Sequence, residues 1–385
     1  MSFLLTKEQL MIQKMAREFA RKDLAPKAAE RDLNHEFPGD SLAKMGELGF
    51  MGMLVSEEYG GDNLGTIAYS LALTEIAAAC ASTAVVMSVH NSICCGSIEK
   101  YGSDQQKEEF LKPMATGEII GAFALTEPEA GSDPQAMACT AEKDGDDYII
   151  NGTKRFITTG KNSGVTILLA RTEPTGSKGI SAFLITHGMD GFEVGRVEDK
   201  MGQCASDTTD LLFNNCRVPS SRMLGKEGEG FTIAMSGLDA GRIGIASLSL
   251  GIANAAMEES IKYGKQREQF GQKITDFQGL RWMIADMAMD IEAARLMVLN
   301  AADIKERGEN CTQAASMAKC FASEMAQRVT GTAIQLHGGY GYIKEYPVER
   351  FYRDARITTI YEGTNQIQRV VISNEILKDK KKKKK

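Results

Sequence analysis

The two ends of the chain carry apolar residues at helical spacing. Near the start, apolar positions share one helical face behind residues 6–9 (TKEQ), a sequence typical of a capping box. The alanine-rich stretch 67–81 then predicts a buried helix. We therefore expect an N-terminal helical domain over residues 1–118.

The middle of the chain instead shows short alternating or β-branched runs. These runs cover residues 121–125, 148–150, 154–158, 165–170, 180–185 and 208–213. Asn151-Gly152 predicts a two-residue hairpin turn, because both turn positions need positive φ. Further turns are expected at 144–146 and 190–191. The prediction is a small antiparallel β domain, a barrel or a sandwich, over residues 119–225.

Helical periodicity returns in longer units after residue 225. Two apolar faces are made by Leu280, Ile284, Met287 and Ile291 and by Phe321, Met325, Val329 and Leu336. Short loops around Gly308 and residues 338–341 favour antiparallel neighbours. We expect a C-terminal helical bundle over 226–377, followed by a lysine-rich tail over 378–385. The fold class is thus α+β, with helices on both sides of a β domain.

Composition and charge narrow the class of protein. The chain is 43% hydrophobic and 25% charged, with a formal net charge of −6. Since residues 380–385 contribute six lysines, the body carries about −12, which argues against binding nucleic acid. The most apolar window, 76–89, is too short to span a bilayer. The first residues lack the pattern of a signal peptide, so the expected location is the cytoplasm, without membrane insertion.

The cysteines and glycine motifs exclude further classes. Eight cysteines are scattered without a CxxC pair or a histidine at metal-ligand spacing, which indicates a reduced, metal-free interior. The glycine pairs at 228–230 and 339–341 lack the third glycine and the βαβ setting of a dinucleotide fingerprint. A nucleophile elbow for Ser-His-Asp chemistry is missing as well.

One carboxylate stands out near the C-terminal end. Glu362 directly precedes Gly363, and Thr364 is placed to cap the following helix. Gly363 allows a ligand to approach the backbone closely. An apolar cavity around Glu362 would raise its pKa towards neutrality, which suits a general base. The alternative is an exposed glutamate that decorates a helix start, where negative charge is favoured.

Four upstream stretches are rich in backbone donors and small polar residues. They are 123–133, a strand entering a Pro/Gly loop; 154–160; 267–271 with 277–278; and 335–342, a helix end opening into a glycine loop. In the second stretch, strand alternation puts Phe156 and Thr158 on one face, where a ring can stack and accept a hydrogen bond. Each stretch alone also fits a plain structural role as a turn, strand, connector or helix cap.

In this order, and followed by residues 361–364, the four stretches resemble the acyl-CoA dehydrogenase family. The resemblance reaches to about residue 377 and is nearest to short-chain and short branched-chain, butyryl-CoA dehydrogenase-like members. It implies FAD bound between the β domain and the C-terminal helices. It also implies an acyl-CoA substrate, an electron-transferring flavoprotein as partner, and a homotetramer built as a dimer of dimers.

The resemblance assigns a role to individual residues. Glu362 would abstract the α-proton while flavin N5 accepts the β-hydride, and the Glu362 backbone N–H would stabilise the thioester oxygen together with a flavin ribityl hydroxyl. The FAD-binding residues would be Phe123, Leu125, Thr126, Gly131, Ser132, Phe156, Ile157, Thr158, Arg267, Phe270, Gln278, Gln335, Leu336, Gly338, Gly339, Thr364 and Gln366. The substrate-binding residues would be Ser132, Asp239, Arg242, Tyr361 and Gly363.

Some of these assignments carry qualifications. Arg267, Gln278 and the loop 335–339 would reach the FAD of a neighbouring subunit. Many family members have Trp where this chain has Phe156, so partner contact there can differ. Relatives with a base on another helix place a Glu where this chain has Gly241, which leaves Glu362 as the base. For Arg242 a buried ion pair within its helix is the alternative.

The acyl group and the electron acceptor stay open at this point. Linear, branched and cyclic short acyl-CoA esters all fit, since a methylene in such a pocket is worth about 1–3 kcal/mol. An acyl-CoA oxidase on the same fold is a second hypothesis. A non-catalytic CoA-ester-binding protein is a third, and the intact Glu362 argues against it.

Overall fold

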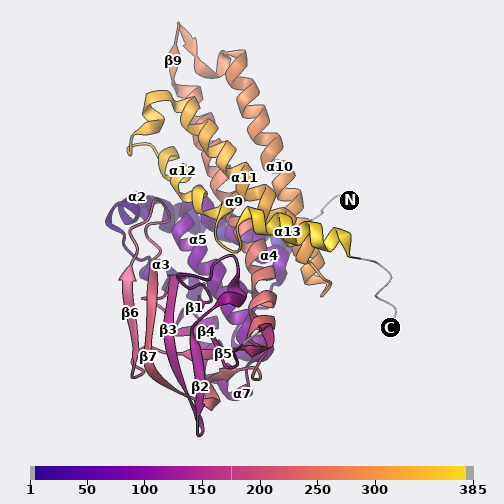
Figure 1. Cartoon of the computed structure of the whole chain (residues 1–385). Coiled ribbons are helices and arrows are strands. Elements are labelled where there is room, and N and C mark those ends of the chain that lie inside the picture. Colours follow the sequence, from indigo (N-terminus) through magenta and orange to yellow (C-terminus); the bar gives the residue numbers. More distant parts are fainter. Residues whose placement is uncertain (1–4, 175, 379–385) are drawn as a thin grey trace.

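The structure is a computed structural model that describes residues 5–174 and 176–378. A β sheet forms one end of the molecule and three long helices form the other, with the N-terminal helices beside them (Figure 1). Of the predicted lysine-rich tail, 378–385, all but Lys378 lie outside the described residues. Among the described residues, no helix is long and apolar enough to cross a membrane.

The N-terminal part is helical, as predicted. Its helices are α1 (Lys7–Phe19), α2 (Ala25–Asn34), α3 (Gly39–Glu47), α4 (Gly65–Ala79), α5 (Ala81–Ser88), α6 (Gly96–Tyr101), α7 (Asp104–Gln106) and α8 (Lys112–Ala115). The capping box is confirmed, because the Thr6 hydroxyl accepts from the Gln9 N–H at 3.1 Å and the Gln9 side chain accepts from the Thr6 N–H. The alanine-rich stretch forms α4, which is buried along most of its length.

The middle part is one eight-stranded sheet. Its strands are β1 (Gly121–Ala124), β2 (Thr140–Asp144), β3 (Asp147–Thr158), β4 (Val165–Arg171), β5 (Ile180–Ile185), β6 (Phe192–Val197), β7 (Thr208–Pro219) and β8 (Met223–Leu224). The order is β6-β7-β3-β2-β4-β5-β8, with β1 paired to β4. Most pairs are antiparallel as expected, but β1 runs parallel to β4.

The predicted hairpin turn at Asn151-Gly152 is wrong. Both residues lie inside β3. The turn between β2 and β3 is the one predicted at residues 144–146, where Gly145 has a φ of +63°. The β3–β7 register shifts between Ile150 and Gly152. A Cβ on Gly152 would lie 2.7 Å from the Cα of Cys139, so glycine is needed for a close approach within the sheet. The same dipeptide thus marks a bulge here and not a turn.

The C-terminal part contains α9 (Gly230–Gln266), α10 (Gln278–Glu306), α11 (Thr312–His337), α12 (Val348–Arg356) and α13 (Asn365–Leu377). The long helices α9, α10 and α11 run side by side, and a two-stranded ribbon of β9 (Glu268–Gln269) and β10 (Gln272–Lys273) joins α9 to α10 (Figure 1). The two apolar faces predicted for this region pack into the core through Met287, Ile291, Met325 and Val329. The predicted helical bundle is confirmed.

Candidate active site

A cavity of about 320 Å³ lies where the sheet meets the helices. From the β domain it is lined by the predicted residues Phe123, Leu125, Thr126, Gly131, Ser132, Phe156, Ile157 and Thr158. From the helical parts it is lined by Arg242, Tyr361, Glu362 and Gly363, and by apolar residues of α5, α9 and α13. The fold therefore brings together segments that lie more than two hundred residues apart in the sequence.

The loop before α13 aims Glu362 into this cavity. Glu362 and Gly363 both have positive φ, +55° and +83°, and such a conformation costs a non-glycine residue about 1–3 kcal/mol. The Gln368 amide holds the turn by donating to the carbonyl oxygens of both residues at 2.9 Å. Thr364 caps α13, with its hydroxyl accepting from the Ile367 N–H at 3.3 Å. Strained backbone held by its surroundings is typical of functional sites.

The Glu362 carboxyl group is buried at the cavity wall. Its Oε2 is shielded from solvent and has no hydrogen-bond partner among the described residues. Burial raises the pKa of Glu362 to about 7, against the opposing charges of Arg242 and Lys319. An exposed carboxylate that decorates a helix start would show neither feature. A carboxyl group with this pKa changes protonation near neutral pH, as a general base requires.

Gly241 provides the space for this carboxyl group. A Cβ added to Gly241 would lie 2.7 Å from Oε2 and 2.9 Å from Cδ of Glu362. Any side chain at position 241 would therefore displace Glu362 from its present place. The position that the resemblance marks as the alternative site of the base is thus packed directly against Glu362.

Arg242 lies in the cavity wall and Asp239 lies behind it. Arg242 Nη1 donates to Asp239 Oδ1 at 2.7 Å, and the other Asp239 oxygen accepts from the Thr312 hydroxyl at 2.6 Å. The Arg242 Nε is buried without a partner among the described residues. The ion pair within α9 is therefore confirmed, and Arg242 also lines the cavity, while its role in binding the substrate stays a prediction. Asp239 does not line the cavity; it orients Arg242.

Phe156 and Thr158 form the β-domain wall of the cleft. The Phe156 ring is 56% exposed, and Phe156 has a positive φ of +59° at a point where the β3–β7 register shifts. Strand alternation is therefore broken, yet both residues face the cleft. A second cavity of about 340 Å³ shares Val85, Phe156, Thr158 and Tyr361 with the first. An exposed aromatic ring beside a hydroxyl, between two joined cavities, fits a large flat cofactor.

A buried ion pair anchors the loop that carries Thr126 and Ser132. Lys154 is fully buried, and its Nζ donates to Glu127 Oε1 at 2.7 Å and to the Leu125 carbonyl at 3.1 Å. The Glu127 carboxylate also accepts from the backbone N–H groups of Ala138 and Cys139, at 2.5 and 3.0 Å. The two ends of the loop are tied to β3 in this way.

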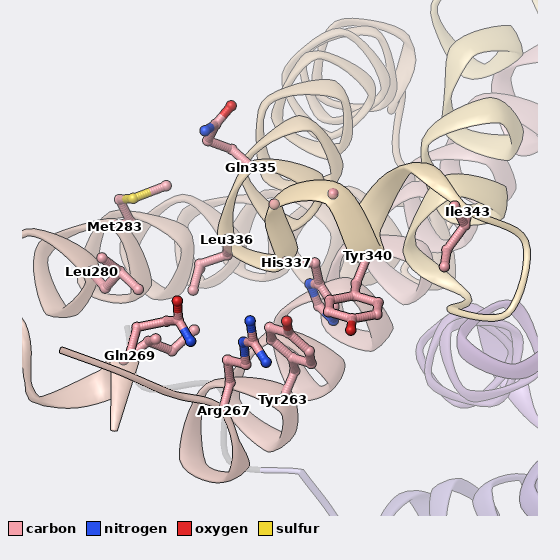
Figure 2. A pocket seen from close by; sticks show the side chains of 13 residues that line it. Tyr263, Arg267, Gln269, Leu280, Met283, Gln335, Leu336, His337, Tyr340 and Ile343 are labelled. Atoms are coloured by element: carbon pink, nitrogen blue, oxygen red, sulfur yellow. The ribbon is translucent and has the colours of Figure 1, made fainter. Parts of the chain in front are cut away.

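The remaining predicted cofactor residues lie elsewhere. A separate cavity of about 580 Å³ lies where α9 and α11 end and α10 begins (Figure 2). It is lined by the predicted residues Arg267, Gln335, Leu336, Gly338 and Gly339. This cavity shares no lining residue with the one around Glu362. One chain therefore does not bring all predicted FAD residues together.

The cavity at Arg267 has an aromatic wall. Tyr263 stacks on His337 with ring centroids 4.3 Å apart, and the Arg267 guanidinium lies 5.5 Å from the Tyr340 ring centroid (Figure 2). Phe270 and Gln278 do not line this cavity. Phe270, three residues after Arg267, is 95% exposed. Near the first cavity, Gln366 is exposed on α13. The cofactor roles of these residues stay predictions.

Sequence reasoning missed several residues that hold the site. Lys154 and Lys319 are buried lysines, and Gln203 and Gln368 are buried amides. Gln203 donates to the Tyr361 hydroxyl at 3.1 Å and, through its backbone N–H, to Asp354 Oδ1 at 2.5 Å. For Lys154 and Lys319, the local signal in the sequence was that each lysine falls at a position where the strand or helix pattern points inward. Such spacing is also common on half-exposed faces.

Comparison with known proteins places the chain in a family. Models of the N-terminal, middle and C-terminal domains of acyl-CoA dehydrogenase match residues 6–118, 122–216 and 228–377. The chain belongs to the acyl-CoA dehydrogenase family and is an oxidoreductase that acts on acyl-CoA.

The similar relatives narrow this class. The chain is 48% identical to a short-chain-specific acyl-CoA dehydrogenase from Clostridium acetobutylicum, over 98% of this chain and 100% of the relative. It is 47% identical to an acryloyl-CoA reductase (NADH) from Anaerotignum propionicum, over 98% of this chain and 96% of the relative.

Solved structures show the same fold. Butyryl-CoA dehydrogenase from Megasphaera elsdenii is 44% identical with a TM-score of 0.96, over 98% of this chain and 100% of that one. A chain from work on the electron-transferring flavoprotein of Acidaminococcus fermentans is 49% identical with a TM-score of 0.97, over the same shares. PigA solved with FAD and proline is 31% identical with a TM-score of 0.94, over 98% and 99%. FAD is the cofactor that these findings support, and the cleft at Phe156 and Thr158 fits it.

Proposed function

We propose that this protein converts a short-chain or short branched-chain acyl-CoA to the 2-enoyl-CoA, with Glu362 as the base. One observation carries the proposal: the carboxyl group of Glu362 is buried at a cavity between the two halves of the molecule, with Oε2 free of protein partners. A pKa of about 7 lets this group accept the α-proton near neutral pH.

The rest of the site supports this chemistry. FAD bound in the cleft supplies the acceptor for the hydride that leaves Cβ. The α-proton is weakly acidic, so the thioester oxygen needs hydrogen-bond donors as charge develops, and the Glu362 backbone N–H is the donor proposed on the chain. Gln368 holds the turn that contains this N–H by donating to the Glu362 and Gly363 carbonyls. We assign Ser132 and Arg242, which both line the cavity, to the binding of the CoA ester.

The apolar part of the cavity lining is the basis for proposing a short acyl chain. Val85, Val89 and Ile93, together with Ile245, supply branched apolar side chains to the lining. Each added methylene in such a pocket changes binding by about 1–3 kcal/mol, so selectivity is graded. We propose C4–C5 acyl groups as the best substrates. A cyclic acyl group of similar volume is the nearest alternative.

We further propose a homotetramer and an electron-transferring flavoprotein as the acceptor. Trp282, Met289 and Leu296 are large apolar residues that are exposed at seven-residue spacing on one side of α10. The cavity at Arg267 lies apart from the one at Glu362, so a neighbouring chain is needed to complete one FAD site. The flavoprotein named with the 49%-identical solved structure supports the choice of acceptor.

The test is anaerobic bleaching of the purified flavoprotein with a panel of acyl-CoA esters, wild type beside Glu362→Gln. Fast bleaching with C4–C5 esters in the wild type and its near-complete loss in Glu362→Gln are expected. Bleaching that persists in Glu362→Gln would overturn the assignment of the base. Rapid peroxide formation under air would favour an oxidase, and NADH-dependent reduction of acryloyl-CoA would favour a reductase.

A further inference from the structure

Lys319 lies directly behind the loop that carries Glu362. It belongs to α11 and is fully buried. Its Nζ donates to the Gly363 carbonyl at 2.8 Å and to Asn365 Oδ1 at 3.0 Å. Both hydrogen bonds therefore hold the segment that directly follows Glu362, residues 363–365.

Asn365 is itself held in one orientation. It is buried at the start of α13, and its Nδ2 donates to Ser323 Oγ at 3.0 Å and to Glu324 Oε1 at 3.2 Å. The amide oxygen must therefore face Lys319. Lys319, Ser323 and Asn365 thus form a connected polar cluster that ties the loop to α11. Such a cluster, when fully hydrogen-bonded, fixes a single arrangement of the groups it joins.

The partners of Lys319 are neutral oxygens. Among the residues that the structure describes, no carboxylate lies within ion-pair distance of its Nζ, in contrast to Lys154 and Glu127. The charges that act on Lys319 are Glu362, Arg242 and Glu324, with the thiol of Cys320. Burial lowers the pKa of Lys319 to about 7, and the Glu362 carboxylate is the first of the charges that oppose this.

Glu362 in turn faces few charged groups. Arg242 on α9 and Lys319 on α11 are the two cations that favour its ionised form. The other titratable groups around it are neutral at pH 7, since burial raises the pKa of the Tyr69 and Tyr361 hydroxyls and of the Cys94 thiol. Arg242 stays charged at every working pH. Of the two cations, only Lys319 changes its charge near neutral pH.

We infer that Lys319 is a positioning residue for the base, and that its charge favours the ionised form of Glu362 on the acid side of neutral pH. Its two hydrogen bonds fix the turn at residues 362–365, and its ammonium group offsets part of the cost of a buried carboxylate. The inference rests on the proposed function in one respect, because it takes Glu362 as the base. A lysine with a purely structural role would hold the same loop and leave the titration of Glu362 unchanged.

The experiment compares Lys319→Met and Lys319→Arg with the wild-type holoenzyme. The first readout is the pH profile of kcat with the best C4–C5 acyl-CoA. Loss of one nearby positive charge is expected to move the acid limb about one pH unit higher in Lys319→Met. Lys319→Arg keeps the charge and is expected to keep the limb in place at a lower kcat.

The second readout does not depend on turnover. The carboxyl band of Glu362 is followed by infrared titration of the substrate-free holoenzyme, assigned by its loss in Glu362→Gln. The band is expected to titrate about one pH unit higher in Lys319→Met than in the wild type. This readout stays valid if no acyl-CoA is turned over, so failure of the proposed function is distinguishable from failure of the inference.

Arg31→Met is the matched control. Arg31 is a buried cation on α2 that donates to Ser41 Oγ at 2.9 Å, away from the cavity around Glu362. It is expected to lower stability without moving the acid limb or the infrared band. If Lys319→Met fails to fold, Lys319→Gln takes its place. A lower kcat with both titrations unchanged in the methionine or glutamine variant would overturn the inference.

Discussion

Two loops line the cavity around Glu362, and each is held by a fully buried lysine. Lys154 pairs with the Glu127 carboxylate, whereas Lys319 donates only to a backbone carbonyl and an amide oxygen. Burial disfavours the charged form of a lysine, and it lowers the pKa of Lys319 to about 7. The β-domain loop therefore has a fixed clamp in the Lys154–Glu127 ion pair, and the loop of Glu362 is held by a lysine that responds to pH.

The largest effect on stability is expected from breaking the fixed clamp. Lys154→Met leaves the Glu127 carboxylate buried without its cation, which costs about 3–5 kcal/mol. Urea denaturation of the holoenzyme measures this loss. The double variant Lys154→Met with Glu127→Gln is expected to recover part of it. Equal losses in the single and double variants would contradict a paired clamp.

A large effect on activity is expected from filling the space beside Glu362. Gly241→Ala adds a Cβ only 2.7 Å from Glu362 Oε2, so the carboxylate must move. A misplacement of this size lowers kcat by about 10²-fold. Stability is expected to stay level or rise by about 0.5–1 kcal/mol, since alanine favours the helix. An active Gly241→Ala variant would show that Glu362 works from another position.

A smaller effect is expected in how stability depends on pH. The pKa of an ordinary lysine side chain is 10.5, and burial lowers the pKa of Lys319 to about 7 in the folded protein. From pH 7 to 10 the unfolded chain therefore binds a proton that the native protein lacks. Stability therefore gains from Lys319 as pH rises through this window, by at most about 1.4 kcal/mol per pH unit. Lys319→Met is expected to lose this rise, whereas Lys154→Met is expected to keep it. Urea melts at pH 7, 8 and 9 make the comparison.

The smallest effect is expected from the helix cap that follows the base. Thr364→Ala removes the hydroxyl that accepts from the Ile367 N–H and is expected to cost about 1 kcal/mol of stability. Thr364→Ser keeps the hydroxyl and serves as the control. If the alanine variant cost more stability than Lys319→Met, the cap rather than Lys319 would be the main support of this loop.

Much of the layout followed from local pattern. The capping box at Thr6 and the cap at Thr364 were predicted because a hydroxyl three residues before a helix-facing N–H is a short-range signal. The helix-sheet-helix order followed from apolar periodicity. Asn151-Gly152 was misassigned because a turn and a bulge make the same demand on glycine, and only the neighbouring Cys139 tells them apart.

The site itself depended on contacts between distant segments. Gly363 and the helix start made Glu362 a candidate, and the family resemblance then gave it the role of base. Its position in the cavity wall depends on packing against α9, which local sequence does not show. Lys319 lies 43 residues before Glu362, in a helix of mostly small and apolar residues. Nothing in the local sequence indicates that its Nζ donates to the Gly363 carbonyl. In the sequence, Gly241 showed only that the alternative position for the base carries no carboxylate. The structure adds that its missing side chain makes room for Glu362.

The most direct measurement is anaerobic bleaching of the flavin by a C4–C5 acyl-CoA in wild type and in Glu362→Gln, followed from pH 5.5 to 9. The wild-type rate is expected to rise with pH through about 7, where Glu362 loses its proton. Loss of a general base is expected to lower the rate by at least about 10²–10⁴-fold in Glu362→Gln at every pH. A Glu362→Gln variant that bleaches at the wild-type rate would contradict the assignment of Glu362 as the base.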